Sequence, residues 1–346
     1  MSAAPSATDV GRAYPTLLGC LEAADAMGAL DLAHDLLDAG VGAESVLLDL
    51  VAPAQVQVGR WWQRNEWSVA QEHAATHISE LVVAAVAGRA APRPYRGKVI
   101  VACIDGEWHA LPARLVGEVL RLRGWQVTFL GASVPAVHLM AYLRRHDAAA
   151  LALACALPMR LPQAHRMIEA CRRADVPILV GGRGFGPGGR WARALGVAWA
   201  PDARAAADLL AAPGSALSEA RGPSTDVGGE EYVALVGRRA DLIDVALQEL
   251  LRPGAGTAGY TSAQWDATTA DLGYLVDFLA AAVYVDDADL FVEAVQWTVE
   301  VLDARAVTST GVLRTLSAFS ETLRDFPRAH RFLQVGRRAL RYPASG

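Results

Sequence analysis

Two pairs of glutamate and histidine stand out among the side chains that could do chemistry. Glu107 and His109 come directly after the apolar run KVIVACI, which is typical of a buried parallel strand. Imidazole can bind a transition metal, and a nearby carboxylate can accept the other ring N–H and fix the tautomer. The pattern therefore predicts a metal ligand, His109, with Glu107 as its hydrogen-bond partner. An exposed loop pair is the alternative.

The second pair, Glu72 and His73, follows Trp62 after nine intervening residues. An indole beside polar side chains suits a nucleoside, which is apolar on its base and polar on its ribose. The alternative is a tryptophan in the core of a helical bundle, with Glu72 and His73 as an exposed pair on a helix. The choice between the two depends on what the rest of the chain builds around them.

The spacing of apolar residues changes along the chain, and it predicts which secondary-structure elements position these residues. Over residues 12–90, apolar residues recur at helical spacing, which predicts a bundle of four or five helices. After the connector AAPRPYRG, short β-type runs alternate with helical segments over residues 97–212. This alternation predicts a Rossmann-like, doubly wound parallel sheet, and ligands of such sheets bind beyond the carboxyl ends of the strands.

Four predicted loops lie at those strand ends. They span residues 105–112, 131–135, 157–161 and 181–187. The first holds Glu107 and His109. The last belongs to the turn VGGRGFGPGG, in which Gly181, Gly182 and Gly184 permit close backbone approach to a bulky group.

A polar linker rich in Gly, Pro and Ser spans residues 213–231, and the segment 232–346 then reads as helical throughout. The predicted helices cover residues 232–251, 262–284, 288–305, 308–324 and 330–340. Asp287 or Asp289 is expected to cap the third of them. The predicted fold class is therefore α/β plus all-α, with a helical cap, a Rossmann-like sheet and a C-terminal helical domain.

Composition limits the classes of function. A chain of 346 residues that is 53% hydrophobic can build two or three domains, each with its own core. A formal net charge of −5 argues against a surface for nucleic-acid phosphates. Charged residues interrupt every apolar run before the roughly 18 residues of a membrane span, and the N-terminus lacks the pattern of a signal peptide. We expect a cytoplasmic protein with no membrane contact and with its four cysteines buried as thiols.

Over residues 12–212, the Glu107-x-His109 motif and the Gly-Gly turn resemble those of the cobalamin-binding domains of methionine synthase, corrinoid methyl carriers and light-sensing cobalamin regulators. The resemblance implies that His109 is the lower axial ligand of cobalt, with Glu107 as its partner. It also implies that Gly181, Gly182 and Gly184 pack the nucleotide tail of the corrinoid.

Three positions depart from the pattern of that family. Pro112 stands where the motif has glycine, and Ala154 and Ala156 stand where serine and threonine are usual. The predicted tail pocket therefore has fewer hydrogen-bond donors than its relatives, although the ligand histidine is retained.

Trp62, Glu72 and His73 resemble the cap of light-sensing cobalamin photoreceptors, which implies that they contact the adenosyl group of adenosylcobalamin. Gln63 stands where related photoreceptors often have a histidine, so a bis-histidine photoproduct through this position is not expected. Those regulators carry a DNA-reading winged helix, and only about a dozen residues precede the predicted bundle here. Direct DNA binding is therefore not expected.

The architecture of segment 232–346 is similar to that of photocobilins, whose helical C-terminal segment binds a linear tetrapyrrole such as biliverdin. A helical dimerisation or docking module is the alternative for this segment. The first hypothesis for the whole chain is a non-enzymatic light sensor, in which cleavage of the cobalt–carbon bond changes the conformation or assembly of a homo-oligomer. The second is a corrinoid methyl carrier of a methyltransferase system. The third is a scaffold that no longer binds cobalamin.

Overall fold

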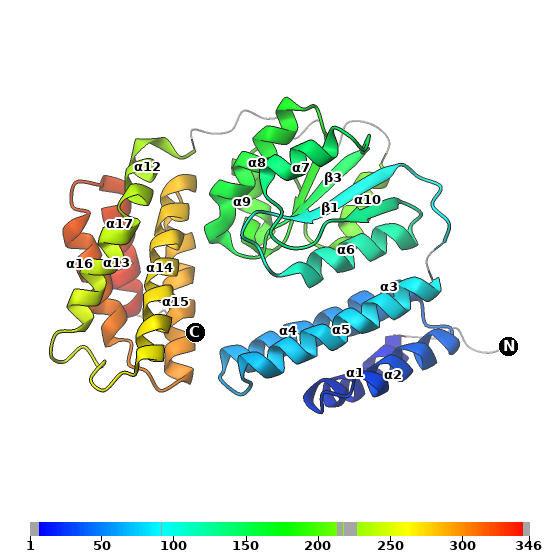
Figure 1. The fold of residues 1–346 in the computed structure, drawn as a ribbon, viewed down its shortest axis with the longest axis horizontal. Coiled ribbons are helices and arrows are strands. Elements are labelled where there is room, and N and C mark those ends of the chain that lie inside the picture. Colours follow the sequence, from blue (N-terminus) through cyan, green and yellow to red (C-terminus); the bar gives the residue numbers. More distant parts are fainter. Residues whose placement is uncertain (1–6, 91, 213–216, 218–226, 342–346) are drawn as a thin grey trace. The chain divides into compact units, whose positions relative to one another are not determined.

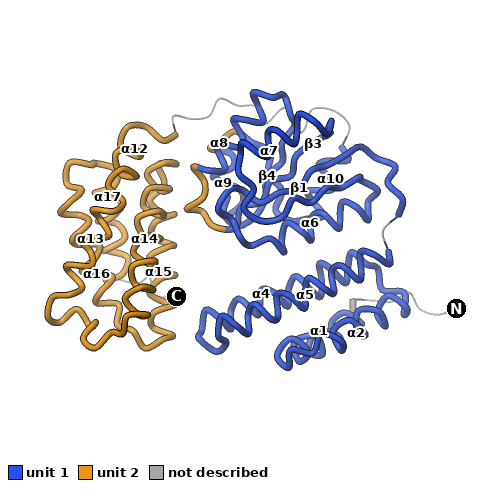
Figure 2. Tube along the Cα trace, in the orientation of Figure 1, with its two compact units in different colours: residues 1–156, 163–193, 197–222 blue, residues 157–162, 194–196, 223–346 orange. Residues whose placement is uncertain are grey.

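The computed structural model describes residues 7–90, 92–212, 217 and 227–341 (Figure 1). The chain divides into two compact units (Figure 2). The first unit comprises residues 1–156, 163–193 and 197–222, and the second comprises residues 157–162, 194–196 and 223–346. Each unit buries a set of apolar side chains of its own.

The first unit begins with a helical bundle, called the cap below. Its elements are α1 (Ala7–Glu22), α2 (Ala26–Asp38), α3 (Ala43–Ser45), the π-helix η1 (Val46–Val51), α4 (Ala52–Gln63) and α5 (Val69–Ala90). Four of the six residues of η1 are buried in the core of the cap. The sequence predicted regular helices over residues 12–90, and the π-helical segment among them is a difference that apolar spacing does not reveal.

A parallel sheet follows, and within the described residues it has five strands in the order β2-β1-β3-β4-β5. The strands are β1 (Lys98–Cys103), β2 (Gln126–Phe129), β3 (Ala150–Ala154), β4 (Ile178–Gly181) and β5 (Ala198–Ala200). The chain passes from β1 outward to β2 and then returns to the other side of β1 with β3. The carboxyl ends of β1 and β3 therefore form the topological switch point, where ligands of such sheets bind.

Helices and short 3₁₀ turns connect the strands. They are α6 (Ala110–Leu122), α7 (Ala136–Leu143), η2 (Pro158–Arg160), α8 (Leu161–Arg173), η3 (Arg183–Phe185), η4 (Pro187–Gly189), α9 (Arg190–Ala194) and α10 (Ala203–Ala211). Helix α6 lies between the cap and the sheet (Figure 1). Its Leu111 and Leu115 are buried in the core of the cap, whereas Ala113, Val119 and Leu120 belong to the core of the sheet. The cap and the sheet are thus joined through two faces of one helix.

The second unit contains the C-terminal helices. They are α12 (Gly229–Gly237), α13 (Arg239–Leu250), α14 (Ser262–Val285), α15 (Ala288–Ala304), α16 (Thr310–Thr322) and α17 (Pro327–Arg341). The first predicted helix is divided at Arg238, and α12 begins at Gly229, within the segment expected to be linker. The prediction of an aspartate cap is confirmed at Asp287, whose side chain accepts a hydrogen bond from the N–H of Asp289 at 3.0 Å.

Helix α14 is long and apolar enough to cross a membrane by length and composition alone. Of its most apolar stretch of 18 residues, 56% is buried inside the protein, and core helices of globular domains have the same properties. Its buried face includes Leu275, Leu279 and Val283.

Candidate functional site

A glutamate–histidine pair lies at the switch point of the sheet. Nδ1 of His109 is 2.6 Å from Oε1 of Glu107, which also accepts the backbone N–H of His109 at 3.0 Å. The other oxygen of Glu107 accepts the N–H of Ala156 at 2.7 Å, so the carboxylate bridges the segments that follow β1 and β3. The side chain of Glu107 is 1% exposed and that of His109 is 58% exposed. Since Nδ1 is hydrogen-bonded to Glu107, Nε2 is the ring atom that can bind a metal.

These contacts shift the pKa of both groups. Burial alone would raise the pKa of Glu107, but the hydrogen bonds from His109 and from the N–H of Ala156 outweigh burial and lower it. The hydrogen bond to Glu107 raises the pKa of His109, burial opposes this, and the charges of Glu107 and Glu72 raise it further. Glu107 is therefore ionised near neutral pH and increases the donor strength of the imidazole. The cap and this pair are neighbours, because α5, which carries Glu72, packs against α6, whose N-cap residue is His109.

Ser133 holds the loop that precedes His109, and sequence reasoning did not single it out. Its Oγ accepts the N–H of Gly106 at 3.1 Å, and its own N–H donates to the backbone oxygen of Glu107 at 2.8 Å. The residue lies in the predicted loop 131–135, at the same edge of the sheet. That shared edge is the signal by which the sequence could have identified it.

The departures from the family pattern have local explanations. Ala156 has no side-chain donor, but its backbone N–H binds Glu107, so the contact does not require a hydroxyl. Pro112 lies in the first turn of α6, where a backbone N–H has no intrahelical partner and proline is tolerated. His109 itself is the N-cap residue of α6, which begins at Ala110, within the predicted loop 105–112.

Trp62 lies in the last turn of α4 and is half-buried. Its neighbour Trp61 stacks on the buried Trp67, with ring centroids 4.5 Å apart, and both belong to the packing of the cap. Trp61 and Trp67 thus take the place in the bundle core that the alternative interpretation gave to Trp62. Contact of Trp62 with a ligand stays a prediction.

Glu72 and His73 lie in the first turn of α5 and are paired. Oε2 of Glu72 is 2.7 Å from Nδ1 of His73, and Oε1 is 2.9 Å from Oγ1 of Thr76, one turn further along the helix. Oγ1 of Thr76 is also 3.2 Å from Oε1 of Gln55, and Gln55 donates to the buried Ser79. The sequence did not identify Thr76, Gln55 or Ser79, although the spacing of four residues between Glu72 and Thr76 is a usable signal.

The glycine-rich turn packs against the segment after β3. A Cβ atom at Gly182 would lie 2.2 Å from the backbone oxygen of Cys155, and one at Gly184 would lie 2.5 Å from its Sγ. The N–H of Gly184 donates to the same oxygen at 2.9 Å. Gly181 ends β4, where a Cβ would make an ordinary contact with Ala200. Packing on Cys155 therefore requires glycine at 182 and 184, and contact of the turn with a nucleotide tail stays a prediction.

Comparison with known proteins was made by family models, by sequence and by structure. A model described as a B12 binding domain matches residues 97–210, and a second model with the same description matches residues 16–87. The HTH-type transcriptional repressor CarA of Myxococcus xanthus is 28% identical over 187 residues, which are 52% of this chain and 60% of that protein. The match thus covers less than two thirds of that relative.

Among solved structures, the monomethylamine corrinoid protein of Methanosarcina barkeri has a TM-score of 0.51 and 18% sequence identity. The superposition covers 57% of this chain and 96% of that one, and at this identity it shows the fold alone. The helical cap and the parallel sheet with its Glu107–His109 pair thus coincide with the two matched family models. Residues 16–87 and 97–210 belong to the B12-binding domain families, and the chain is a cobalamin-binding protein.

Proposed function

We propose that this protein is a light-dependent switch that holds adenosylcobalamin between the cap and the carboxyl edge of the sheet. The observation that carries the proposal is that the cap and the sheet domain bring their candidate ligand-binding residues close to one another. Glu72 lies on α5 of the cap, which packs against α6 of the sheet domain, and His109 is the N-cap residue of α6. The charge of Glu72 also raises the pKa of His109. This arrangement supports a single site formed by residues of both domains.

The residues present fit the cofactor. His109 would hold the cobalt through Nε2, since its tautomer is fixed by the hydrogen bond from Nδ1 to the buried carboxylate of Glu107. Trp62 supplies an aromatic surface outside the bundle core, and Glu72 and His73 supply polar groups for a ribose. When bound, adenosylcobalamin supplies a cobalt–carbon bond that visible light can break.

In this proposal, the side chains of the protein bind and orient the cofactor and do not catalyse a reaction of a substrate. Glu107 keeps His109 oriented, and Thr76 and His73 keep Glu72 in place on α5. Loss of the adenosyl group would remove the partner of Trp62 and Glu72 and leave His109 unaffected. The cap would then lose its contacts with the cofactor, whereas the sheet domain would keep its own through His109. A two-state switch requires such a difference, because a ligand shifts a conformational equilibrium only when it interacts differently with the two states.

We extend the proposal to the second unit as a site for biliverdin or for contact with a second copy of the chain. Tyr274 on α14 and Trp297 on α15 are 48% and 41% exposed, and aromatic rings of this kind can flank a tetrapyrrole or a partner helix. An absorption spectrum distinguishes the two alternatives, since only bound biliverdin would add a far-red absorption band.

A corrinoid methyl carrier is the second candidate, because the Glu107–His109 pair would serve methylcobalamin equally well. Trp62 with Glu72 and His73 distinguishes the candidates, since a methyl group is too small to occupy an aromatic and polar surface of this size. The light switch is therefore the function that the site supports best.

The test is a comparison of protein loaded with adenosylcobalamin in the dark and after green light. We expect the absorption spectrum to change permanently and the elution volume in size-exclusion chromatography to shift. Protein loaded with cyanocobalamin is the control and should respond in neither measurement. An unchanged spectrum and elution volume after illumination would contradict the proposal, and preferential retention of methylcobalamin without a light response would favour the carrier.

A further inference from the structure

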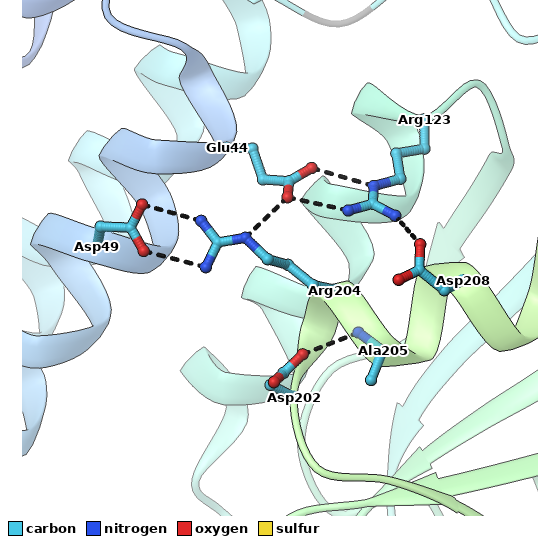
Figure 3. A network of polar contacts seen from close by, with 7 residues as sticks. All are labelled: Glu44, Asp49, Arg123, Asp202, Arg204, Ala205 and Asp208. Atoms are coloured by element: carbon cyan, nitrogen blue, oxygen red, sulfur yellow. Dashed lines mark hydrogen bonds and ion pairs between the residues drawn. The ribbon is translucent and has the colours of Figure 1, made fainter. Parts of the chain in front are cut away.

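A cluster of charged side chains connects the cap to the sheet domain (Figure 3). We call it the joint cluster, and it consists of Glu44, Asp49, Arg123, Arg204 and Asp208. Arg123 binds both oxygens of Glu44, at 3.1 and 3.0 Å, and also contacts Asp208. Arg204 binds both oxygens of Asp49, at 3.0 and 2.9 Å, and reaches Glu44 at 3.1 Å. Two arginine–carboxylate pairs, each with two hydrogen bonds, thus connect the cap to the sheet domain. Such bidentate pairs are stronger than pairs with a single hydrogen bond.

The chain itself crosses between the two domains at the same place. In the connecting segment 92–97, the backbone N–H groups of Tyr95 and Arg96 both donate to the oxygen of Gly124, at 3.0 and 2.9 Å. The hydroxyl of Tyr95 donates to the oxygen of Arg123 at 3.2 Å. The covalent connection and the joint cluster therefore meet at the C-terminal end of α6.

The other end of α6 carries His109, the proposed cobalt ligand. The helix has 13 residues and begins directly after His109, so its length of about 20 Å separates His109 from Arg123. At the His109 end, the cap is held by the burial of Leu111 and Leu115 in its core. At the Arg123 end, charged and backbone contacts add to apolar packing, because Leu122 packs against the core of the cap and Leu48 against the core of the sheet. The contacts described at the His109 end, where the corrinoid is proposed to bind, are apolar.

The π-helix in the cap aligns the two carboxylates of the joint cluster. Glu44 and Asp49 are five residues apart, and in a regular α-helix such residues point about 140° away from one another. In η1 the hydrogen bonding shifts to residues five apart, as in the bond from the N–H of Ala52 to the oxygen of Leu47. This widening turns both carboxylates toward Arg204, and single π-helical turns of this kind occur frequently at functional sites.

We propose that the joint cluster is the pivot of the cap. The cap parts from the sheet domain at the His109 end to admit a corrinoid, and it stays attached at the Arg123 end throughout. The proposal concerns entry of the cofactor and therefore holds or fails independently of any response to light.

The first test uses hydrogen–deuterium exchange in the cobalamin-free protein. We expect slower exchange in residues 43–51 and 203–209, at the joint cluster, than in residues 62–72 and 105–111, at the corrinoid end. Arg204→Gln should raise exchange in residues 43–51 about two- to fivefold, the effect of losing partly exposed ion pairs. Salt at 1 M should raise exchange there in the wild type and add little in the variant.

Arg12→Gln is the matched control, because Arg12 is an exposed arginine of the cap that pairs with Asp9 at 3.2 Å, outside the joint cluster. It should leave exchange in residues 43–51 unchanged. Equal exchange at both ends of the boundary, or no effect of Arg204→Gln and salt, would overturn the proposal. Circular dichroism of the variant checks that its helices are intact, and Arg204→Lys offers a milder change if they are not.

The second test locks the pivot. In a Cys20→Ser background, Glu44→Cys and Arg204→Cys are joined by a short bis-maleimide, and uptake of hydroxocobalamin is followed by absorbance. If the joint cluster is a pivot, the cross-link should change the uptake rate by no more than about twofold relative to the same variant without the cross-link. This is far less than the tenfold change in rate that corresponds to about 1.4 kcal/mol. Blocked uptake would overturn the proposal, because it would mean that the cap must leave the sheet domain at the joint cluster.

Discussion

At the scale of single residues, the site depends on a buried carboxylate that holds an exposed imidazole. Glu107 accepts hydrogen bonds from His109 and from the N–H of Ala156, and every one of these contacts favours its ionised form. The charge of Glu107 therefore suits His109 to the metal-ligand role that we propose for it.

Replacing that charge should weaken cofactor binding. We expect Glu107→Gln to lower the affinity for hydroxocobalamin about 10- to 100-fold, as other changes to the hydrogen-bond partners of metal ligands do. Spectrophotometric titration measures the affinity. Glu80→Gln, at an exposed glutamate of α5, is the control with the same change of charge. An unchanged affinity for Glu107→Gln would mean that His109 does not act through this pair.

The cysteines allow a prediction from their pKa values. Burial, with the charge of Glu107 adding to it, raises the pKa of Cys103 to about 12, and burial raises the pKa of Cys171 to about 12. Only the thiolate is nucleophilic, and at pH 8 about one such group in ten thousand would be ionised. Cys20 was expected to be buried like the others, but it is half-exposed because it lies near the surface of the cap.

We therefore expect iodoacetamide at pH 8 to alkylate Cys20 in the native protein and to leave the buried Cys103, Cys155 and Cys171 unmodified. Peptide mass spectrometry measures each site, and unfolded protein, in which the four thiols should react, is the control. Rapid modification of Cys103 would show that the loop before His109 opens in solution.

At the scale of elements, the turn after β4 and the helix after β1 position the site. The turn needs glycine for two different reasons at two positions. Gly182 has a φ of 102° and no room for a Cβ, whereas Gly188 has a φ of 57° and nothing within 4 Å of a Cβ. Substitution of each of these two glycines by alanine therefore separates the destabilisation caused by a steric clash from that caused by a side chain on a left-handed backbone.

Gly182→Ala should lower the free energy of unfolding by about 2–3 kcal/mol, because it adds a clash with Cys155 to backbone strain. Gly188→Ala should cost only about 1 kcal/mol. Thermal unfolding followed by circular dichroism measures both, with an expected loss of about 2–4 °C per kcal/mol for a unit of this size. Equal losses in the two variants would contradict the clash.

At the scale of the whole molecule, the residues assigned to the corrinoid belong to the first unit, and both B12-binding domain matches end by residue 210. A shortened chain of residues 1–212 should therefore bind hydroxocobalamin with the affinity of the full chain. The same titration measures this, and circular dichroism checks the fold of the shortened chain. A folded fragment that binds poorly would show that the second unit contributes to the site.

Local patterns determined much of this protein. The sequence alone predicted the helical cap, four strands of the sheet and the places of Glu107 and His109 at a strand end, because periodicity and strand-end position depend on neighbours in the chain. It did not find β5, since the run AWA is too short to differ from a loop, and it missed the break at Arg238, where the apolar spacing continues.

Only the tertiary structure decided the remaining features. Arg204 meets Glu44 across 160 positions of sequence, Gly182 packs on Cys155, and Glu72 comes near His109 from another domain. The π-helix that turns Glu44 and Asp49 toward one arginine has no signature in apolar spacing. Each of these depends on how packed elements face one another, and that arrangement is fixed by contacts between residues that are distant in the chain.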